Sequence, residues 1–106
     1  MEIIHKLEVV KNRWEEISEQ MNDPEVMTDM KRYVKLNKDY KDLEPLVTAY
    51  KEYKSIIANI DGAKEVIDTE EDADFKEMAK EELDKLVPEK EVLEEKIRML
   101  LIPKDP

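Results

Sequence analysis

Apolar residues recur at alternating steps of three and four along most of the 106-residue chain, which is the spacing of one face of an α-helix. The first stripe predicts a helix over residues 3–21 and comprises Ile3, Leu7, Val10, Trp14, Ile17 and Met21. Residues 22–25 (NDPE) end this helix. Asp23 is a good N-cap for a short turn that follows, and Pro24 suits the first helical position. Thr28 or Asp29 then opens the next helix.

A second stripe predicts a long helix over residues 28–68. Its members are Tyr33, Leu36, Tyr40, Leu43, Val47, Tyr50, Tyr53, Ile57, Ile60, Ala63 and Ile67. Pro45 lies inside this run, and a proline removes a backbone donor and crowds the preceding turn, so we expect a kink or a break near residue 45. Gly62, the only glycine, falls where the apolar period continues. We interpret it as an interior helical residue that costs about 1 kcal/mol relative to alanine.

The acidic residues 68–74 (DTEEDAD) predict a linker before a last helix over residues 74–101. Asp74 with Glu77 resembles a capping box, which places the start of that helix at Asp74. The third apolar stripe consists of Phe75, Ala79, Leu83, Leu86, Leu93, Ile97 and Leu100. Pro88 interrupts the pattern and predicts a second kink.

These helices predict an all-α fold in a single domain over residues 1–106. The short linker makes residues 28–68 and 74–101 antiparallel neighbours, because neither apolar stripe can face water. We therefore expect an elongated antiparallel helical hairpin or coiled coil, with an additional N-terminal helix packed on it.

The composition adds that the chain is acidic and folded. Charged residues make up 43% and apolar residues 41%, and the net charge is −10. Residues 1–60 carry 12 acids and 10 bases, whereas residues 61–106 carry 16 acids and 8 bases. Because such a surface repels phosphate backbones, we do not expect autonomous nucleic-acid binding. The absence of cysteine and of any apolar run longer than residues 99–102 favours a cytoplasmic protein that does not bind membranes.

Conventional catalytic and metal sites find little support in the sequence. Phosphate-binding loops need two or more glycines, His5 is the only histidine, and cysteine is absent. The alternating acids of residues 68–74 suggest a calcium loop, but Ala73 and Ala79 stand where such a loop requires glycine and glutamate. We therefore expect no catalytic residue, no cofactor and no bound metal.

Basic side chains gather at the beginning of the second predicted helix. They are Lys31, Arg32, Lys35 and Lys38, with Lys41 following. Positions 31, 35 and 38 share a helix face, which is compatible with contact to ribosomal RNA or to a protein. The alternative is ordinary surface charge paired with Asp39 and Asp42, four residues further on.

The aromatic residues allow two interpretations. Trp14, Tyr33, Tyr40, Tyr50 and Tyr53 could stack on nucleic-acid bases. Their positions on the apolar stripes favour packing in the core or at its rim instead.

Four ordered segments carry a resemblance to a known family. They are residues 22–26 (NDPEV), 42–47 (DLEPLV), 49–54 (AYKEYK) and 100–106 (LLIPKDP). Together they resemble the N-terminal helical domain of the bacterial peptide chain release factor 1 family, over the whole chain. The resemblance implies a class I factor that reads UAA and UAG and triggers hydrolysis of peptidyl-tRNA. The family's Gly-Gly-Gln and Pro-x-Thr motifs do not occur here, so no residue of this chain takes their roles.

The resemblance also implies partners for this domain. They are the GTPase-associated region of the large ribosomal subunit with its stalk base protein, and the class II release factor, which is a GTPase. A generic acidic coiled-coil adaptor or chaperone-like module is the alternative from another class. The UGA-reading paralogue is a third possibility, against which residues 23–26 (DPEV) and 103–106 (PKDP) count.

Overall fold

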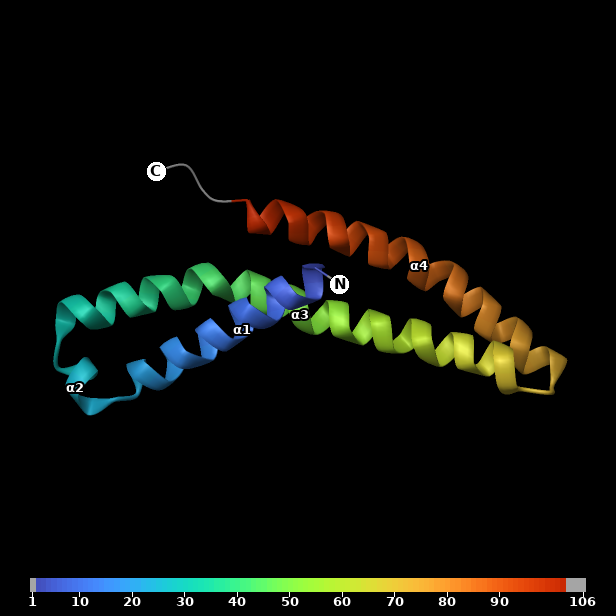
Figure 1. The fold of residues 1–106 in the computed structure, drawn as a ribbon, viewed down its shortest axis with the longest axis horizontal. Coiled ribbons are helices and arrows are strands. Elements are labelled where there is room, and N and C mark those ends of the chain that lie inside the picture. Colours follow the sequence, from blue (N-terminus) through green and yellow to red (C-terminus); the bar gives the residue numbers. More distant parts are fainter. Residues whose placement is uncertain (1, 103–106) are drawn as a thin grey trace. The chain divides into compact units, whose positions relative to one another are not determined.

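The structure, a computed structural model, describes residues 2–102, and every element in that range is a helix (Figure 1). The helices are α1 (Glu2–Met21), α2 (Pro24–Met27), α3 (Met30–Thr69) and α4 (Ala73–Leu101). The predicted all-α fold class is confirmed. The chain divides into two compact units with the boundary between Tyr50 and Lys51, here called the N-terminal and C-terminal units. The single-domain organisation stays a prediction.

In the N-terminal unit, α1 runs antiparallel to the first part of α3, and α2 lies in the connection between them (Figure 1). Its core is a cluster of one buried residue from each helix: Ile17, Val26 and Leu36. Partly buried Met21, Tyr33, Tyr40 and Leu43 pack against this cluster. The apolar stripe of α1 is therefore covered as the helical period requires.

The caps of α2 and α3 confirm the assignments made from the sequence. Asp23 is the N-cap of α2, where its Oδ1 accepts a hydrogen bond of 2.9 Å from the backbone N–H of Glu25, and Pro24 is the first helical residue. Asp29 then precedes α3, and its Oδ1 accepts at 3.3 Å from the backbone N–H of Arg32. Side-chain oxygens thus satisfy backbone donors that lack partners within the helix.

In the C-terminal unit, α4 returns antiparallel beside the second part of α3 after a connection of three residues, 70–72 (Figure 1). The buried residues of α4 include Ala79, Leu86 and Leu93, which are spaced by seven. Tyr53 and Ile60 of α3 are also buried and are also seven apart. This spacing is the seam of a two-helix coiled coil. Of the arm expected over residues 28–68, residues 51–69 form an antiparallel hairpin with residues 73–101.

The cap of α4 differs from the prediction. Asp72, not Asp74, is the N-cap: its Oδ1 accepts from the backbone N–H groups of Asp74 at 2.8 Å and Phe75 at 3.4 Å. The backbone N–H of Asp72 is itself bonded to Glu70 Oε1 at 3.2 Å. Several residues of this acidic segment have a side chain that can cap a helix. Asp72 is the one that takes this role, because it also takes part in the turn that connects α3 and α4.

Both interior prolines lie within continuous helices, so the break expected near residue 45 is absent. Pro45 and Pro88 are exposed, and the carbonyls that lose a helical partner belong to Lys41 and Asp84, four residues earlier and also exposed. The lost hydrogen bonds therefore lie at exposed positions of their helices, where they cost less than in a core. A kink at either proline stays a prediction.

Within residues 2–102, none of the helices combines the length and the apolar character needed to cross a bilayer.

Candidate interaction surface

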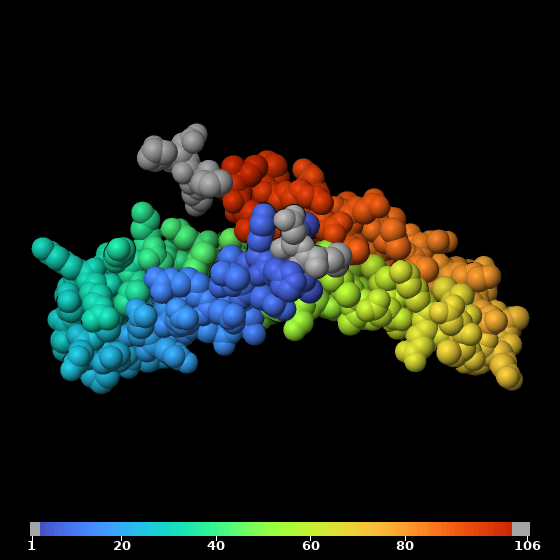
Figure 2. Space-filling view, in the orientation of Figure 1, coloured from blue at the N-terminus to red at the C-terminus, as the bar shows by residue number. Residues whose placement is uncertain are grey.

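The four basic residues singled out from the sequence form an exposed stripe on the first turns of α3. We call Lys31, Arg32, Lys35 and Lys38 the basic stripe; all four side chains are exposed. In the space-filling view this part of α3, coloured cyan to green, lies at the surface (Figure 2). Lys31, Lys35 and Lys38 are spaced by four and three, so they project from one side of the helix.

The basic stripe does not form the ion pairs that would make it ordinary paired surface charge. Among residues 2–102, ion pairs form elsewhere, such as Lys11 with Glu15 at 3.4 Å and Arg98 with Glu95 at 3.4 Å. None involves the four residues of the stripe, and the pairing with Asp39 and Asp42 considered above is not formed. The four charges therefore have no ion-pair partner among the described carboxylates, which leaves them available to a phosphate or to an acidic surface.

The aromatic side chains are used for packing. Tyr50 and Tyr53 are buried, and Trp14 stacks on Tyr40 with 4.9 Å between ring centroids and 23° between the ring planes. The indole N–H of Trp14 is buried without a hydrogen-bond partner within the described residues. Rings held in this way are not presented for stacking on bases, so the packing interpretation is the one that the structure supports.

One polar contact that the sequence did not reveal joins the two helices of the C-terminal unit. The hydroxyl of Tyr53 on α3 donates to Glu94 Oε2 on α4 at 2.7 Å. Tyr53 is 0% exposed. Burial, followed by the hydrogen bond to Glu94 and its negative charge, raises the pKa of Tyr53 to about 12. A tyrosine on an apolar stripe gives no sign of its partner, because the partner is 41 residues away in the sequence.

Replacing Tyr53 by phenylalanine should lower the free energy of unfolding by about 1–2 kcal/mol, since it removes a hydrogen bond to a charged group and keeps the ring. Urea unfolding at pH 7 followed by circular dichroism measures this. Tyr33→Phe is the matched control, because the Tyr33 hydroxyl forms no hydrogen bond within the described residues. A loss that is equal in both variants would contradict the role of Glu94.

The same contact predicts a pH dependence. The pKa of Tyr53 in the folded chain, about 12, is above its ordinary value of 10.0, so the folded state holds the proton more tightly. Its contribution to stability is therefore complete below pH 10 and is lost as the pH rises toward 12. The difference in stability between the natural chain and Tyr53→Phe should shrink over that interval.

Other side chains give little sign of a catalytic or metal centre. Within residues 2–102, no three histidine, cysteine or acidic residues come together in a group that could hold a metal ion. The His5 side chain is exposed and lies 4.0 Å from Glu8.

Comparison with known proteins places the chain in a family. A family model described as the PCRF domain matches residues 10–106. The chain belongs to the PCRF domain family. Its resemblance to bacterial release factor 1 is confirmed over nearly the whole chain.

Three relatives illustrate the extent of the similarity. Each is named peptide chain release factor 1. The proteins from Cytophaga hutchinsonii and Bacteroides fragilis are each 50% identical over 104 residues, which is 98% of this chain and 29% and 28% of theirs. The protein from Streptococcus agalactiae is 46% identical over 107 residues, which covers all of this chain and 30% of the relative. The chain thus spans less than a third of the length of these relatives. No solved structure matches it.

The segments that carried the resemblance have definite places in the structure. Residues 22–26 form the cap and the body of α2, and residues 42–47 and 49–54 lie in α3. Residues 103–106, which end the fourth segment, lie outside the described residues.

Proposed function

We propose that this chain is the N-terminal domain of a class I peptide chain release factor and acts in translation termination at UAA and UAG codons. The observation that carries the proposal is the identity of 46–50% to proteins named peptide chain release factor 1 along 98–100% of the chain. Within that factor, the domain is an arm that contacts the GTPase-associated region of the large ribosomal subunit, the class II release factor, or both.

The basic stripe supports a contact with ribosomal RNA or with an acidic protein surface. Four exposed cations stand together on α3 in a chain whose net charge is −10. Long-range attraction to RNA is therefore weak, and binding depends on the local concentration of positive charge. Such a surface suits a domain that is held near the ribosome by other parts of a larger protein.

Reversal of the basic stripe tests this proposal. The 106-residue chain that carries Lys31→Glu, Arg32→Glu, Lys35→Glu and Lys38→Glu should bind purified large ribosomal subunits at least about tenfold more weakly at low salt. The dependence of the logarithm of the affinity on the logarithm of salt concentration should flatten by up to about four, one for each lost phosphate contact. Fluorescence anisotropy of labelled chain measures both quantities.

A charge-matched variant is the control for net charge. Replacing Lys64, Lys80, Lys85 and Lys96 by glutamate shifts the net charge by the same −8, at exposed positions of the C-terminal unit. If this variant binds as weakly as the stripe variant, the stripe has no local role. If neither variant changes the affinity for the subunits, the generic coiled-coil adaptor is the better description.

We also expect that the chain does not release peptide by itself. It has no Gly-Gly-Gln sequence and no cysteine, and its one histidine, His5, has an exposed side chain near the start of α1. Adding it to a purified termination complex that carries labelled peptidyl-tRNA should give the hydrolysis rate of buffer alone. Hydrolysis above that background would contradict an arm without chemistry.

A further inference from the structure

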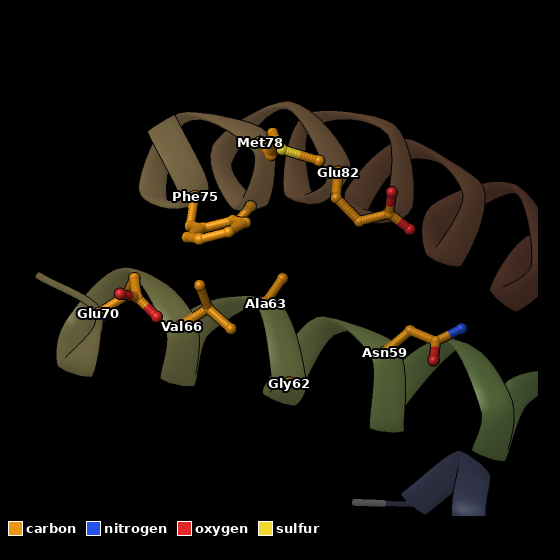
Figure 3. Close-up of a pocket in the computed structure, with 9 residues that line it drawn as sticks. Asn59, Gly62, Ala63, Val66, Glu70, Phe75, Met78 and Glu82 are labelled. Atoms are coloured by element: carbon orange, nitrogen blue, oxygen red, sulfur yellow. The ribbon is translucent and has the colours of Figure 1, made fainter. Parts of the chain in front are cut away.

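An open apolar groove lies between α3 and α4 next to their connection, at the tip of the C-terminal hairpin. It has a volume of about 460 Å³. Phe75 of α4 and Val66 of α3 face one another across it, and Met78 lies further along α4 (Figure 3). Phe75 is 56% exposed and Met78 is 63% exposed. We call this site the tip groove. Its size is that of a site for a side chain or a small ligand, and its large apolar groups are left in contact with water.

Gly62 lines the tip groove and has no other structural reason to be glycine. No described residue has a positive φ, so the backbone does not require it, and a Cβ added there would meet nothing within 4 Å. In the interior of α3 it costs about 1 kcal/mol relative to alanine. What the missing side chain provides is room: a glycine at this position allows another molecule to approach the helix backbone closely from the groove.

The surroundings of the groove are strongly negative. Glu70 and Glu82 line it, and no basic residue does. Residues 59–82 carry ten acids and three bases, which gives a net charge of −7. An occupant must therefore be apolar where it enters the groove and positive around that point.

We propose that the tip groove is a docking site for a helix of a basic protein that presents an apolar side chain flanked by lysine or arginine. The apolar side chain enters between Phe75 and Val66, the partner's backbone approaches at Gly62, and the flanking cations reach Glu70 and Glu82. This is the arrangement of an amphipathic helix in a groove. The site lies in the unit that does not carry the basic stripe, so it is separate from the proposed ribosomal RNA contact.

Other occupants fit the charge less well. A second copy that docked tip to tip would bring another surface of the same sign, and nucleic acids and anionic lipid surfaces are also negative. A small apolar molecule would leave the acidic rim without a function. A basic, amphipathic helix satisfies both the apolar floor and the rim.

The probe for this proposal is an 18-residue helical peptide of leucine and lysine in which leucine recurs at steps of three and four. At about 150 mM salt, where free surface charges are screened beyond about 8 Å, it should bind the 106-residue chain and shift the methyl resonances of Met78 and Val66. Gly62→Leu should weaken binding at least about tenfold, because it adds a bulky side chain at a position that lines the groove, while leucine, a good helix former, keeps α3 folded. Thr48→Leu, at an exposed position of α3 outside the groove, is the matched control and should bind as the natural chain does.

A second peptide with glutamine in place of each leucine keeps the positive charge and removes the apolar anchor. It should bind at least about tenfold more weakly than the first. Equal binding of the two peptides, equal binding by Gly62→Leu, or no binding at all would overturn the proposal. Concentration-dependent dimerisation that Gly62→Leu abolishes would overturn it in favour of a second copy. Because these measurements use no ribosome, their failure is distinct from a failure of the proposed function.

Discussion

Replacing Ile17 by alanine is expected to lower the free energy of unfolding of the N-terminal unit by about 2–5 kcal/mol. Ile17 is 0% exposed and lies in the cluster that joins α1, α2 and α3. The change removes three carbons of a buried side chain and leaves a cavity in the cluster with Val26 and Leu36, which these residues fill only in part. Since small domains are stable by about 5–15 kcal/mol, the effect is a large fraction of the total.

The single tryptophan makes this measurement specific. Trp14 stacks on Tyr40 within the N-terminal unit, so its fluorescence during urea unfolding reports that unit. Val9→Ala is the control, because Val9 lies on the same helix and is exposed; its effect should stay within about 0.5 kcal/mol. An unchanged Trp14 transition in Ile17→Ala would show that the cluster does not hold α1 in place.

Replacing Pro88 by alanine is expected to raise the free energy of unfolding by about 2–3 kcal/mol. Pro88 is exposed within the continuous helix α4, where proline is about 3 kcal/mol less favourable than alanine. Alanine supplies the missing N–H donor, which can then bond the carbonyl of Asp84 in place of water. Thermal or urea unfolding followed by circular dichroism at the helical band gives the change.

The neighbouring residue provides the control for this prediction. Glu89→Ala introduces the same side chain at an exposed position that already has its backbone donor, so its effect should stay within about 0.5 kcal/mol. If Pro88→Ala unfolds at the same or at a lower denaturant concentration, then the packing of α4 depends on the proline ring or on a bend that it causes.

Local chemistry explains why so much of the fold could be predicted. The cap at Asp23 and the helical start at Pro24 depend on the side chains of adjacent residues only, so the sequence contains all the information needed. The apolar stripes likewise identify which face of each helix is covered, and Ile17, Leu36 and Leu93 are buried as their spacing requires.

The features that could not be predicted correctly depend on interactions that the local sequence does not encode. Asp72 and Asp74 have the same side chain, and only the geometry of the three-residue connection decides which of them caps α4. Pro45 favours a break in isolation, but it lies with Lys41 on an exposed part of α3, and the helix continues. The bond between Tyr53 and Glu94 requires the pairing of two helices, which no stretch of residues shows by itself.

The basic stripe and the tip groove also differ in how far the sequence predicts them. The sequence predicts the basic stripe because its members are close neighbours on one helix, whereas only the structure shows that they form no ion pairs. The tip groove could not be inferred, because it combines Val66 of α3 with Phe75 and Met78 of α4. Gly62 is the one residue of the groove that stands out in the sequence, where it indicates only an interior glycine that destabilises its helix.

Gly62 has a consequence for anyone who engineers this chain for heat resistance. Exchanging it for alanine is among the first substitutions that such an effort would choose, because it favours the helix and meets no obstacle. The same methyl group would narrow the site where we place a partner's backbone. Thermal stability and partner binding thus place opposing requirements on residue 62. A variant selected for higher thermal stability would bind the partner more weakly without any change in its fold.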